Sequence, residues 1–321
     1  MTFYMPESHL PSPDRRAAWE SGSPPTLLAG GKSASAQAWI FQTFIELHTC
    51  ADVKLSTVLP DHGVVVTLAN FLPTGFRAPP DLFIAAVVAD FVPHPGTQLS
   101  IVQNAAHARR LPRSIFLRHW PQPGLLPRRR ERGDALERVA FFGDPSNLAP
   151  ELASPEFARR LHQSTGAILE SRAPARWADF SDVDVALAIR DFSGAQHLNK
   201  PATKLYNAWL AGVPLLTGRD SAYRAEATNG SDYQIARSPD HAIEVIASWR
   251  NNPSIRNAIV ENGHKKTALC SRDAVRRQWK DFCTQELPAR AEEWFRRSPV
   301  ARTRFWLAQR MVFWLDRHIR S

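Results

Sequence analysis

Residues 184–217 read DVALAIRDFSGAQHLNKPATKLYNAWLAGVPLLT, and this stretch decides the fold class. An apolar run opens the stretch and turns polar at Arg190. A predicted helix then begins at Pro201 and stops before Gly212, because proline favours the first helical turn and glycine the position after the end. Val213–Thr217 forms the next short apolar run. The order of strand, loop, helix and strand predicts a βαβ unit of an α/β protein.

Cationic and hydroxyl side chains gather where the predicted strand gives way to the helix. Lys200 and Lys204 flank the first helical turn, Thr203 adds a hydroxyl, and Arg190 follows the strand. A helix N-terminus favours an anion and disfavours unpaired cations, and ligands of parallel sheets bind at the carboxyl ends of strands. We therefore predict that these four residues bind a diphosphate. Two solvated lysines at an ordinary helix start are the alternative.

Short apolar runs outside this stretch predict further parallel strands. Runs of Val, Ile and Leu without alternation are typical of strands buried on both faces. In the first part of the chain they lie at Thr2–Met5, Val53–Val58, Val64–Leu68, Leu82–Val88, Leu99–Val102 and Ile115–Leu117. Helical spacing of apolar residues predicts a helix at Ser35–His48, whereas Pro6–Lys32 is rich in Pro, Ser and Gly and predicts a long loop.

A second set of elements follows a break in the pattern. Residues 121–133 read PQPGLLPRRRERG, which is typical of a connection between domains. Predicted strands then lie at Arg138–Gly143, Gly166–Leu169 and Asp182–Ile189, and predicted helices at Phe157–Thr165, His241–Trp249, Pro253–Lys266 and Ser271–Glu286. We expect an N-terminal domain at 1–125, a second domain at 126–289 and a basic, aromatic C-terminal helix at 290–321.

Several stretches resemble GT-B glycosyltransferases. KPATKLYNAWLAGVPLLTG, at 200–218, resembles the donor-site helix of that family, and DVALAIR resembles the strand before it. RVAFFGDPSNL, at 138–148, is similar to the opening strand and glycine turn of the family's donor domain. FLRHWPQPGLLPR and DLFIAAVVAD resemble the interdomain segment and acceptor domain of a bacterial subset. The resemblance covers most of the chain from about residue 30 to residue 282 and is strongest at 184–216.

The resemblance implies a fold and an activity. The fold is two Rossmann-like domains facing across a cleft, followed here by a C-terminal helical extension. The activity is that of a hexosyl- or related transferase, which moves a sugar from a nucleoside-diphosphate sugar to a glycan, a lipid-linked glycan or a protein. The second domain would bind the nucleotide sugar and the first would bind the acceptor. A GT-B epimerase of sugar nucleotides and a non-catalytic sugar-nucleotide-binding protein are the alternatives.

The resemblance also assigns roles to single residues. Gly143 would let the backbone approach the donor because glycine has no Cβ, and Gly30 and Gly31 are similar candidates in the first domain. Many retaining members of the family carry two glutamates with seven residues between them, and Asn199 and Asn207 stand at those positions here. Asparagine still forms hydrogen bonds with ribose or sugar hydroxyls but carries no charge, so the stereochemical outcome stays open.

An inverting transfer needs a group that takes the proton of the acceptor hydroxyl, and Asp, Glu or His is the usual choice. Asp90 follows the apolar run Leu82–Ala89, and His94 comes shortly after it. We rank Asp90 first and His94 second as catalytic residues. His119 in the interdomain segment and the pair Asp61–His62 in a turn are further candidates. For each of them, a role in packing or in a turn is the alternative.

The C-terminal segment mixes arginines with aromatic residues, and on a helix from Val300 its apolar residues spread over a broad face. Such a helix either packs back across the two domains or lies on an anionic membrane surface. The two alternatives do not exclude each other, and both remain open. The longest apolar run, Leu82–Ala89, is too short to span a bilayer, and the N-terminus lacks the pattern of a signal peptide. We expect a cytoplasmic protein, with peripheral contact at the inner membrane face under the second alternative.

Composition narrows the classes of partner. The net charge is +9, and 33 of the 40 basic residues are Arg, which binds phosphate or carboxylate through two parallel hydrogen bonds. A GC-rich genome explains the same bias equally well. The basic residues are scattered or in short clusters and no nucleic-acid-reading motif is present, so we expect no nucleic acid partner.

Metal ions and further cofactors are not expected. The three cysteines have no metal-ligand spacing, which also favours a reducing compartment. Asp182–Asp184 spells the D-x-D motif of metal-dependent glycosyltransferases, but it stands at the start of an apolar strand and we interpret it as structural. The nucleoside-diphosphate sugar would be the only co-substrate.

Overall fold

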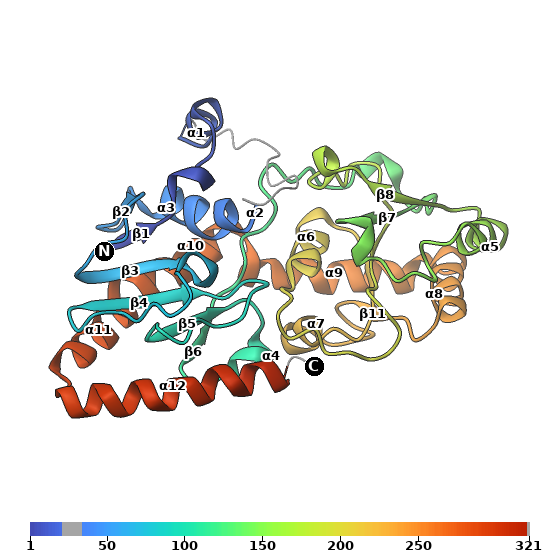
Figure 1. The fold of residues 1–321 in the computed structure, drawn as a ribbon. Helices are drawn as coiled ribbons and strands as arrows, with labels where there is room; N and C mark the ends of the chain where they lie inside the picture. Colours follow the sequence, from blue (N-terminus) through green and yellow to red (C-terminus); the bar gives the residue numbers. More distant parts are fainter. Residues whose placement is uncertain (21–33, 320–321) are drawn as a thin grey trace.

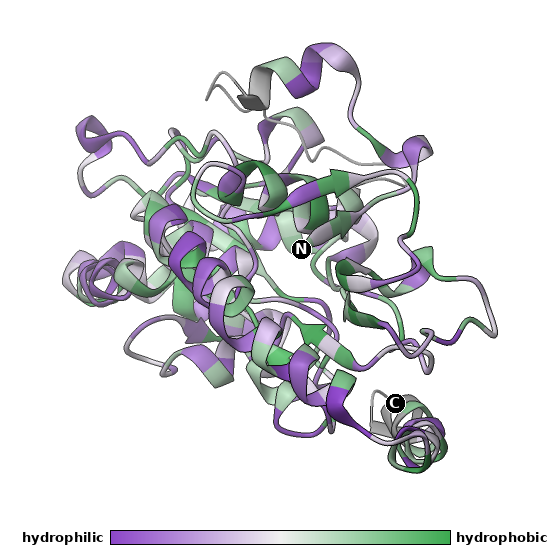
Figure 2. Ribbon diagram, turned by 90° about the vertical axis from the view of Figure 1, so that its left-hand side faces the viewer, coloured by the Kyte–Doolittle hydropathy of each residue, from purple (hydrophilic) through white to green (hydrophobic). Residues whose placement is uncertain are grey.

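The fold is described from a computed structural model of the chain, shown in Figure 1. The structure describes residues 1–20 and 34–319, so Gly30 and Gly31 lie outside the described residues. The strands form two parallel sheets, one in each half of the molecule, and helices cover both (Figure 1). Figure 2 shows apolar residues concentrated on the strands and on the helix faces next to them.

The first sheet has the strand order β2-β1-β3-β4-β5-β6, and every pairing in it is parallel. Its strands are β1 (Thr2–Tyr4), β2 (Lys54–Ser56), β3 (Gly63–Leu68), β4 (Leu82–Val87), β5 (Leu99–Val102) and β6 (Ser114–Phe116). All six strands predicted in this part of the chain are confirmed. Every residue of β4 and β5 is buried, which explains why they read as continuous apolar runs.

The N-terminal helices differ in part from the prediction. The helix predicted at Ser35–His48 is confirmed as α2 (Ala34–Ala36), the π-helical turn η2 (Gln37–Phe41) and α3 (Gln42–Leu47). The long loop predicted at Pro6–Lys32 is wrong in its first part, which forms η1 (Glu7–His9) and α1 (Pro13–Glu20). Pro13 and Asp14 occupy the first turn of α1, where proline and an acidic residue favour a helix start.

The second sheet has the order β11-β10-β9-β7-β8 and is also parallel throughout. Its strands are β7 (Arg138–Phe142), β8 (Ile168–Arg172), β9 (Val185–Ala188), β10 (Leu215–Thr217) and β11 (Gln234–Ile235). Among the helices are α5 (Pro155–Thr165), α6 (Thr203–Ala211), α7 (Ser221–Glu226), α8 (Pro239–Asn251) and α9 (Pro253–Cys270). The helix predicted from Pro201 starts two residues later, and Gly212 ends it in a left-handed conformation, as expected.

The chain returns to the first domain after α9. The returning segment contains α10 (Arg272–Asp281), the π-helical turn η7 (Phe282–Glu286), α11 (Leu287–Arg296) and α12 (Pro299–Ile319). Val275, Trp279, Phe282 and Leu287 are buried in the same core as β1 and β4. In Figure 1, α10 and α11 accordingly lie against the first sheet. Residues 272–289, which we expected in the second domain, therefore pack in the first. The apolar face of a helix does not reveal which domain covers it.

The C-terminal helix α12 runs along the first domain, with its end near α4 (Ala105–Ala108) and α7 (Figure 1). Its inner face buries Phe305 and Trp306, whose rings meet Trp294 edge-on at 5.0 and 5.4 Å. The buried Gln309 donates a hydrogen bond to the carbonyl of Thr97 at 3.0 Å and accepts one from Arg113 at 2.6 Å. The inner face of α12 therefore packs against the first domain, and these contacts do not extend across both domains as the packing alternative stated.

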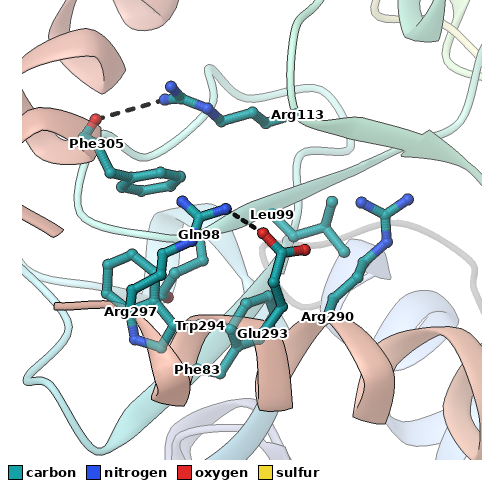
Figure 3. A pocket seen from close by; sticks show the side chains of 9 residues that line it. All are labelled: Phe83, Gln98, Leu99, Arg113, Arg290, Glu293, Trp294, Arg297 and Phe305. Atoms are coloured by element: carbon teal, nitrogen blue, oxygen red, sulfur yellow. Dashed lines mark hydrogen bonds and ion pairs between the residues drawn. The ribbon is translucent and has the colours of Figure 1, made fainter. Parts of the chain in front are cut away.

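A small cavity of about 120 Å³ lies between the C-terminal helices α11 and α12 and the first sheet (Figure 3). Arg113 lies 4.2 Å from the centroid of the Phe305 ring, and Arg297 forms an ion pair with Glu293. Burial and the charge of Arg297 lower the pKa of Arg113. Leu99 begins β5 on one wall, so this cavity lies at the amino ends of the strands, away from the edge where ligands of parallel sheets bind.

Candidate active site

The carboxyl ends of the two sheets meet at the boundary between the domains. Three contacts join residues that follow strands of the first sheet to the loop before α6 and to the start of α7. They are Lys200 Nζ to Asp90 Oδ1 at 2.9 Å, Gln103 Nε2 to the carbonyl of Asn199 at 2.6 Å, and Asn104 Nδ2 to Ser221 Oγ at 2.9 Å. The predicted diphosphate-binding loop and the favoured catalytic carboxylate therefore lie together, although they are far apart in sequence.

Asp90 and Lys200 form an ion pair that bridges the domains. The side chain of Asp90 is 50% exposed and that of Lys200 is 25% exposed, so the pair stays accessible. Two non-glycine residues in the same loops, Ala89 and His197, both have φ of 47°. Such left-handed conformations cost about 1–3 kcal/mol each and cluster at functional sites. The loops that carry this pair are therefore held in strained conformations.

Lys204 lies against the ring of Phe141, with Nζ 4.9 Å from the ring centroid. Burial, together with the positive charges of Arg190 and Lys200, lowers its pKa to about 7. A Cβ on Gly143 would stand 3.3 Å from Lys204 Nζ, and Gly143 has φ of 154°. The lack of a Cβ at Gly143 therefore leaves room for Lys204 Nζ, and the approach of a donor to this glycine stays a prediction.

Arg190 is fixed by two polar partners. Its Nε donates to Asp220 Oδ2 at 3.1 Å and its Nη1 donates to Asn147 Oδ1 at 2.7 Å. The Asp220 side chain is only 3% exposed, and burial raises its pKa although Arg190 acts in the opposite direction. Arg190 is therefore held in one orientation, with its remaining nitrogen left to contact a ligand.

Thr203 is the first residue of α6, and its Oγ1 is buried. It has no hydrogen-bond partner among the described residues. Buried hydroxyls are nearly always paired, so this hydroxyl has the capacity to bind a ligand at the start of α6. The orphan hydroxyl, the N-terminus of α6 and the side chains of Lys200 and Lys204 together favour an anion at this place.

The two asparagines have partners other than those expected. Asn207 is buried, and its Oδ1 accepts a hydrogen bond from the backbone N–H of Gln122 at 2.9 Å. It thereby holds the interdomain segment against α6. Asn199 contributes its backbone carbonyl to Gln103. The contact of Asn207 with ribose or sugar, expected from the family resemblance, stays a prediction, and in this structure its Oδ1 makes a structural hydrogen bond to the interdomain segment.

His94 also has a structural task. Its Nδ1 accepts a hydrogen bond from the backbone of Gly96 at 3.1 Å, and its Nε2 donates to the carbonyl of Pro73 at 3.1 Å. Burial lowers its pKa. Since both ring nitrogens are engaged within the loop, neither is available to take a proton from an acceptor. The structure therefore does not support His94 as a catalytic base.

The remaining candidates for the catalytic base differ in their distance from the domain boundary. Asp61 and His62 are exposed and pair with each other just before β3, at its amino end, away from the domain boundary. His119 lies at the boundary, where its Nδ1 donates to the carbonyl of Trp120 at 2.7 Å. Burial lowers the pKa of His119, and the nearby charge of Asp90 opposes this. Of these candidates, His119 is the one whose pKa responds to the charge of Asp90.

The Asp182–Asp184 triplet is structural, as interpreted from the sequence. Asp182 accepts from Arg172 at 2.6 Å, and the fully buried Asp184 accepts from Arg128 at 2.8 Å and Arg132 at 2.6 Å. These carboxylates already have cationic partners, so they do not form a loop ready to hold an ion.

Sequence reasoning missed Asp220, Gln103 and Asn104. Each is a polar residue within three positions of the last residue of a buried strand, β10 or β5. The same signal had singled out Arg190 after β9. Polar residues that follow buried parallel strands meet at one edge, so applying this rule to every predicted strand would have found all three.

Comparisons with known proteins identify the fold. No known protein family matches the sequence, and no curated protein sequence is similar to it. Solved structures do match. HepE from Anabaena, in complex with UDP and glucose, has a TM-score of 0.53 at 10% identity over 88% of this chain and 99% of its own.

Two further structures show the same similarity. They are a mutant of S. aureus TarM in complex with UDP and other ligands (TM-score 0.51, 9% identity, 76% of this chain) and the pneumococcal O-GlcNAc transferase GtfA in complex with UDP and GlcNAc (0.50, 11%, 73%). The chain spans 59% and 57% of the length of these two proteins. At such low identities the similarity concerns the fold alone. The chain therefore has the GT-B fold, with two Rossmann-like domains and a C-terminal helical segment that returns to the first.

Proposed function

We propose that this protein is a glycosyltransferase that moves a sugar from a nucleoside-diphosphate sugar to an acceptor. The observation that carries the proposal is the group at the start of α6, where the first helical turn carries Lys204 and the buried hydroxyl of Thr203, and the positive charges of Arg190 and Lys200 lower the pKa of Lys204. The group lies at the carboxyl edge of a parallel sheet within a GT-B fold. HepE, TarM and GtfA, which share that fold, were each solved with UDP.

The donor diphosphate would bind at this group and neutralise it. An arriving diphosphate competes with Asp90 for Lys200 and favours the protonated form of Lys204, whose pKa is about 7 without it. Three cations around the diphosphate stabilise the negative charge that grows on the leaving group as the sugar departs. We propose that these side chains stabilise the leaving diphosphate without a metal ion, so that EDTA leaves both nucleotide binding and transfer unchanged.

Asp90 is the proposed acceptor of the proton from the attacking hydroxyl. It belongs to the opposite domain, and once Lys200 turns to the diphosphate its carboxylate is released. The ion pair therefore orders the events: the donor binds first, and only then does Asp90 become a base.

The first test is calorimetric titration with UDP, GDP, dTDP and CMP, each with and without EDTA. Binding of one nucleoside diphosphate, unchanged by EDTA, supports the donor site and identifies the nucleobase of the donor. Release of that nucleotide from its sugar conjugates, accelerated by an acceptor, supports transfer. A folded protein that binds none of the nucleotides would contradict the proposal, and binding without turnover would favour the non-catalytic alternative.

We also propose that α12 rests on an anionic membrane surface. Val300, Leu307, Met311 and Trp314 are all exposed, and their spacing places them on one face of the helix, opposite the buried Phe305. Arg304 lies on the same exposed face and matches an anionic headgroup. No described helix is both long enough and apolar enough to cross a bilayer.

Flotation with vesicles tests this surface contact. We expect binding to phosphatidylglycerol vesicles, weaker binding to phosphatidylcholine vesicles, and loss of both in Leu307→Asp/Met311→Asp. Ile255→Asp, which adds a charge at an exposed position of α9, is the matched control. Equal flotation of the double variant and the control would show that α12 is not the contact.

A further inference from the structure

An apolar pocket lies beside Asp90 in the first domain. It has a volume of about 460 Å³, which is within the range of ligand pockets. Its walls are the segment after β3, the loop after β4 and one side chain of α12: Ala69, Asn70, Leu72, Thr74, Gly75, Phe91, Val92, Pro93, His94, Pro95 and Phe313. Since Asp90 directly precedes Phe91, the pocket opens at the same sheet edge as the proposed base.

The lining offers few hydrogen-bonding groups. Among the lining residues that the structure describes, only Asn70, Thr74 and His94 have polar side chains, and both ring nitrogens of His94 are engaged by Pro73 and Gly96. A buried sugar ring needs a partner for each of several hydroxyls, and each unpaired one is costly. A hydrocarbon needs none. The chemistry of the walls therefore suits a hydrocarbon better than a sugar.

The mouth of the pocket exposes apolar side chains. Phe91 is 37% exposed and Val92 is 41% exposed, although both follow a fully buried strand. Single exposed apolar residues are ordinary, but these two are adjacent, line one pocket and stand next to a reactive carboxylate. Covering them with an apolar ligand removes their surface from water.

A second cavity, of about 260 Å³, adjoins the first and supplies positive charge. Gly75 and Pro95 line both cavities. The second is also lined by Arg77 and Arg310, and the guanidinium of Arg77 lies 5.1 Å from the centroid of the Trp306 ring. Arginine binds phosphate well. Apolar walls next to two arginines match a molecule with a hydrocarbon chain and a phosphate.

We propose that this pair of cavities binds a membrane lipid phosphate, with its hydrocarbon chain in the pocket beside Asp90 and its phosphate at Arg77 and Arg310. The inference goes beyond the proposed transferase function, because this orientation places the hydrocarbon chain, and not an acceptor hydroxyl beyond the phosphate, next to Asp90. It also connects the site with α12, because Phe313 of that helix forms one wall while its opposite face carries the exposed apolar stripe.

Binding of hexyl, octyl and decyl phosphate, each below its critical micelle concentration, tests the proposal by calorimetry. Each buried methylene strengthens binding severalfold, so affinity should rise at least about tenfold from hexyl to decyl phosphate. Val92→Asp places a charge at the mouth and should abolish this rise. The matched control is Ile255→Asp, whose position is 44% exposed on α9. Thermal unfolding of both variants verifies that they are folded.

Two outcomes overturn the pocket: equal affinity for the three alkyl phosphates, which would mean that only the phosphate is bound, or an unchanged rise in folded Val92→Asp. Nucleotide titration of the same wild-type sample separates this inference from the proposed function. If the protein binds a nucleotide but its affinity for alkyl phosphates does not depend on chain length, the donor site is supported and the lipid pocket is contradicted. Chain-dependent binding without nucleotide binding contradicts the transferase and leaves a lipid-binding pocket.

Discussion

The two sheet edges that meet at the domain boundary carry opposite chemistry. The edge of the second domain is cationic and is organised by the pair of Arg190 with Asp220. The edge of the first domain holds the carboxylate of Asp90 beside an apolar pocket. The charge of a nucleoside diphosphate suits the edge of the second domain, and the hydrocarbon chain of a lipid suits the edge of the first. The fold thus brings together two kinds of recognition that one domain alone does not offer.

The two carboxylates at this boundary show the same contrast. Asp220 is almost fully buried and pairs with Arg190 within one domain, whereas Asp90 is half exposed and pairs with Lys200 of the other domain. Breaking a buried pair leaves an uncompensated charge in a low dielectric, but an exposed pair exchanges partners at little cost. Asp220 therefore serves to hold the site together, and Asp90 is suited to change partner during a reaction.

The largest effect is expected from Asp220→Ala. Loss of the buried carboxylate leaves Arg190 unpaired and should lower the free energy of unfolding by about 3–5 kcal/mol. Urea denaturation measures this. Asp240→Ala, which removes the partner of Arg160 in an exposed pair, is the control and should cost less than about 1 kcal/mol. Similar losses in the two variants would erase the contrast between buried and exposed pairs.

Lys204→Ala should come next, with nucleoside-diphosphate affinity reduced about 100-fold while the fold is kept. The variant loses a charge-assisted hydrogen bond to phosphate, which contributes about 1.5–3 kcal/mol. Calorimetry measures the affinity. Lys265→Ala, on the exposed face of α9, is the matched control and should bind like the wild type. Unchanged affinity in Lys204→Ala would remove this residue from the donor site.

The next effect is a change of about tenfold in nucleoside-diphosphate affinity with pH. Lys204 has a lowered pKa of about 7 in the free protein, and a bound diphosphate favours its protonated form. Above pH 7 the free protein has lost a proton that the complex retains, so affinity should fall about tenfold between pH 7 and pH 8.5. Titrations at several pH values test this in the wild type and in Lys204→Ala. A slope that persists in the variant would assign the proton to another group.

The smallest binding effect is expected from Asp90→Asn. Lys200 loses its competing partner, so nucleoside-diphosphate affinity should rise about threefold, while stability changes by less than about 1 kcal/mol. Transfer to an acceptor should fall sharply, because amide nitrogen and oxygen take no proton. Calorimetry and a product assay measure the two effects separately. Weaker nucleotide binding in this variant would show that Asp90 does not compete with the donor for Lys200.

Much of the fold was predictable because parallel strands leave a strong local signal. β4 and β5 are buried on both faces, so their composition alone identifies them. Gly212 marks the end of α6 for an equally local reason, since its left-handed conformation suits glycine. α1 was missed because the segment around it is rich in Pro and Ser, and such a composition hides a short helix.

The site was predictable only in part. Arg190, Lys200, Thr203 and Lys204 follow one strand in the sequence, and their residue types alone indicated an anion site. His94 was assigned a role that its hydrogen bonds do not allow, and Asn207 has a structural partner that the sequence did not indicate. Those bonds come from Gly96 and Gln122, and nothing in a linear pattern shows that these backbones approach so closely.

The sequence by itself determined the α/β class, the strands, the end of α6 at Gly212 and the cationic character of its first turn. These follow from the burial, periodicity and charge of neighbouring residues. Only the tertiary structure decided that Asp90 pairs with Lys200, that Asp220 orients Arg190, and that the helices after α9 return to the first domain. Each of these joins residues distant in the chain, and such contacts depend on how whole domains pack.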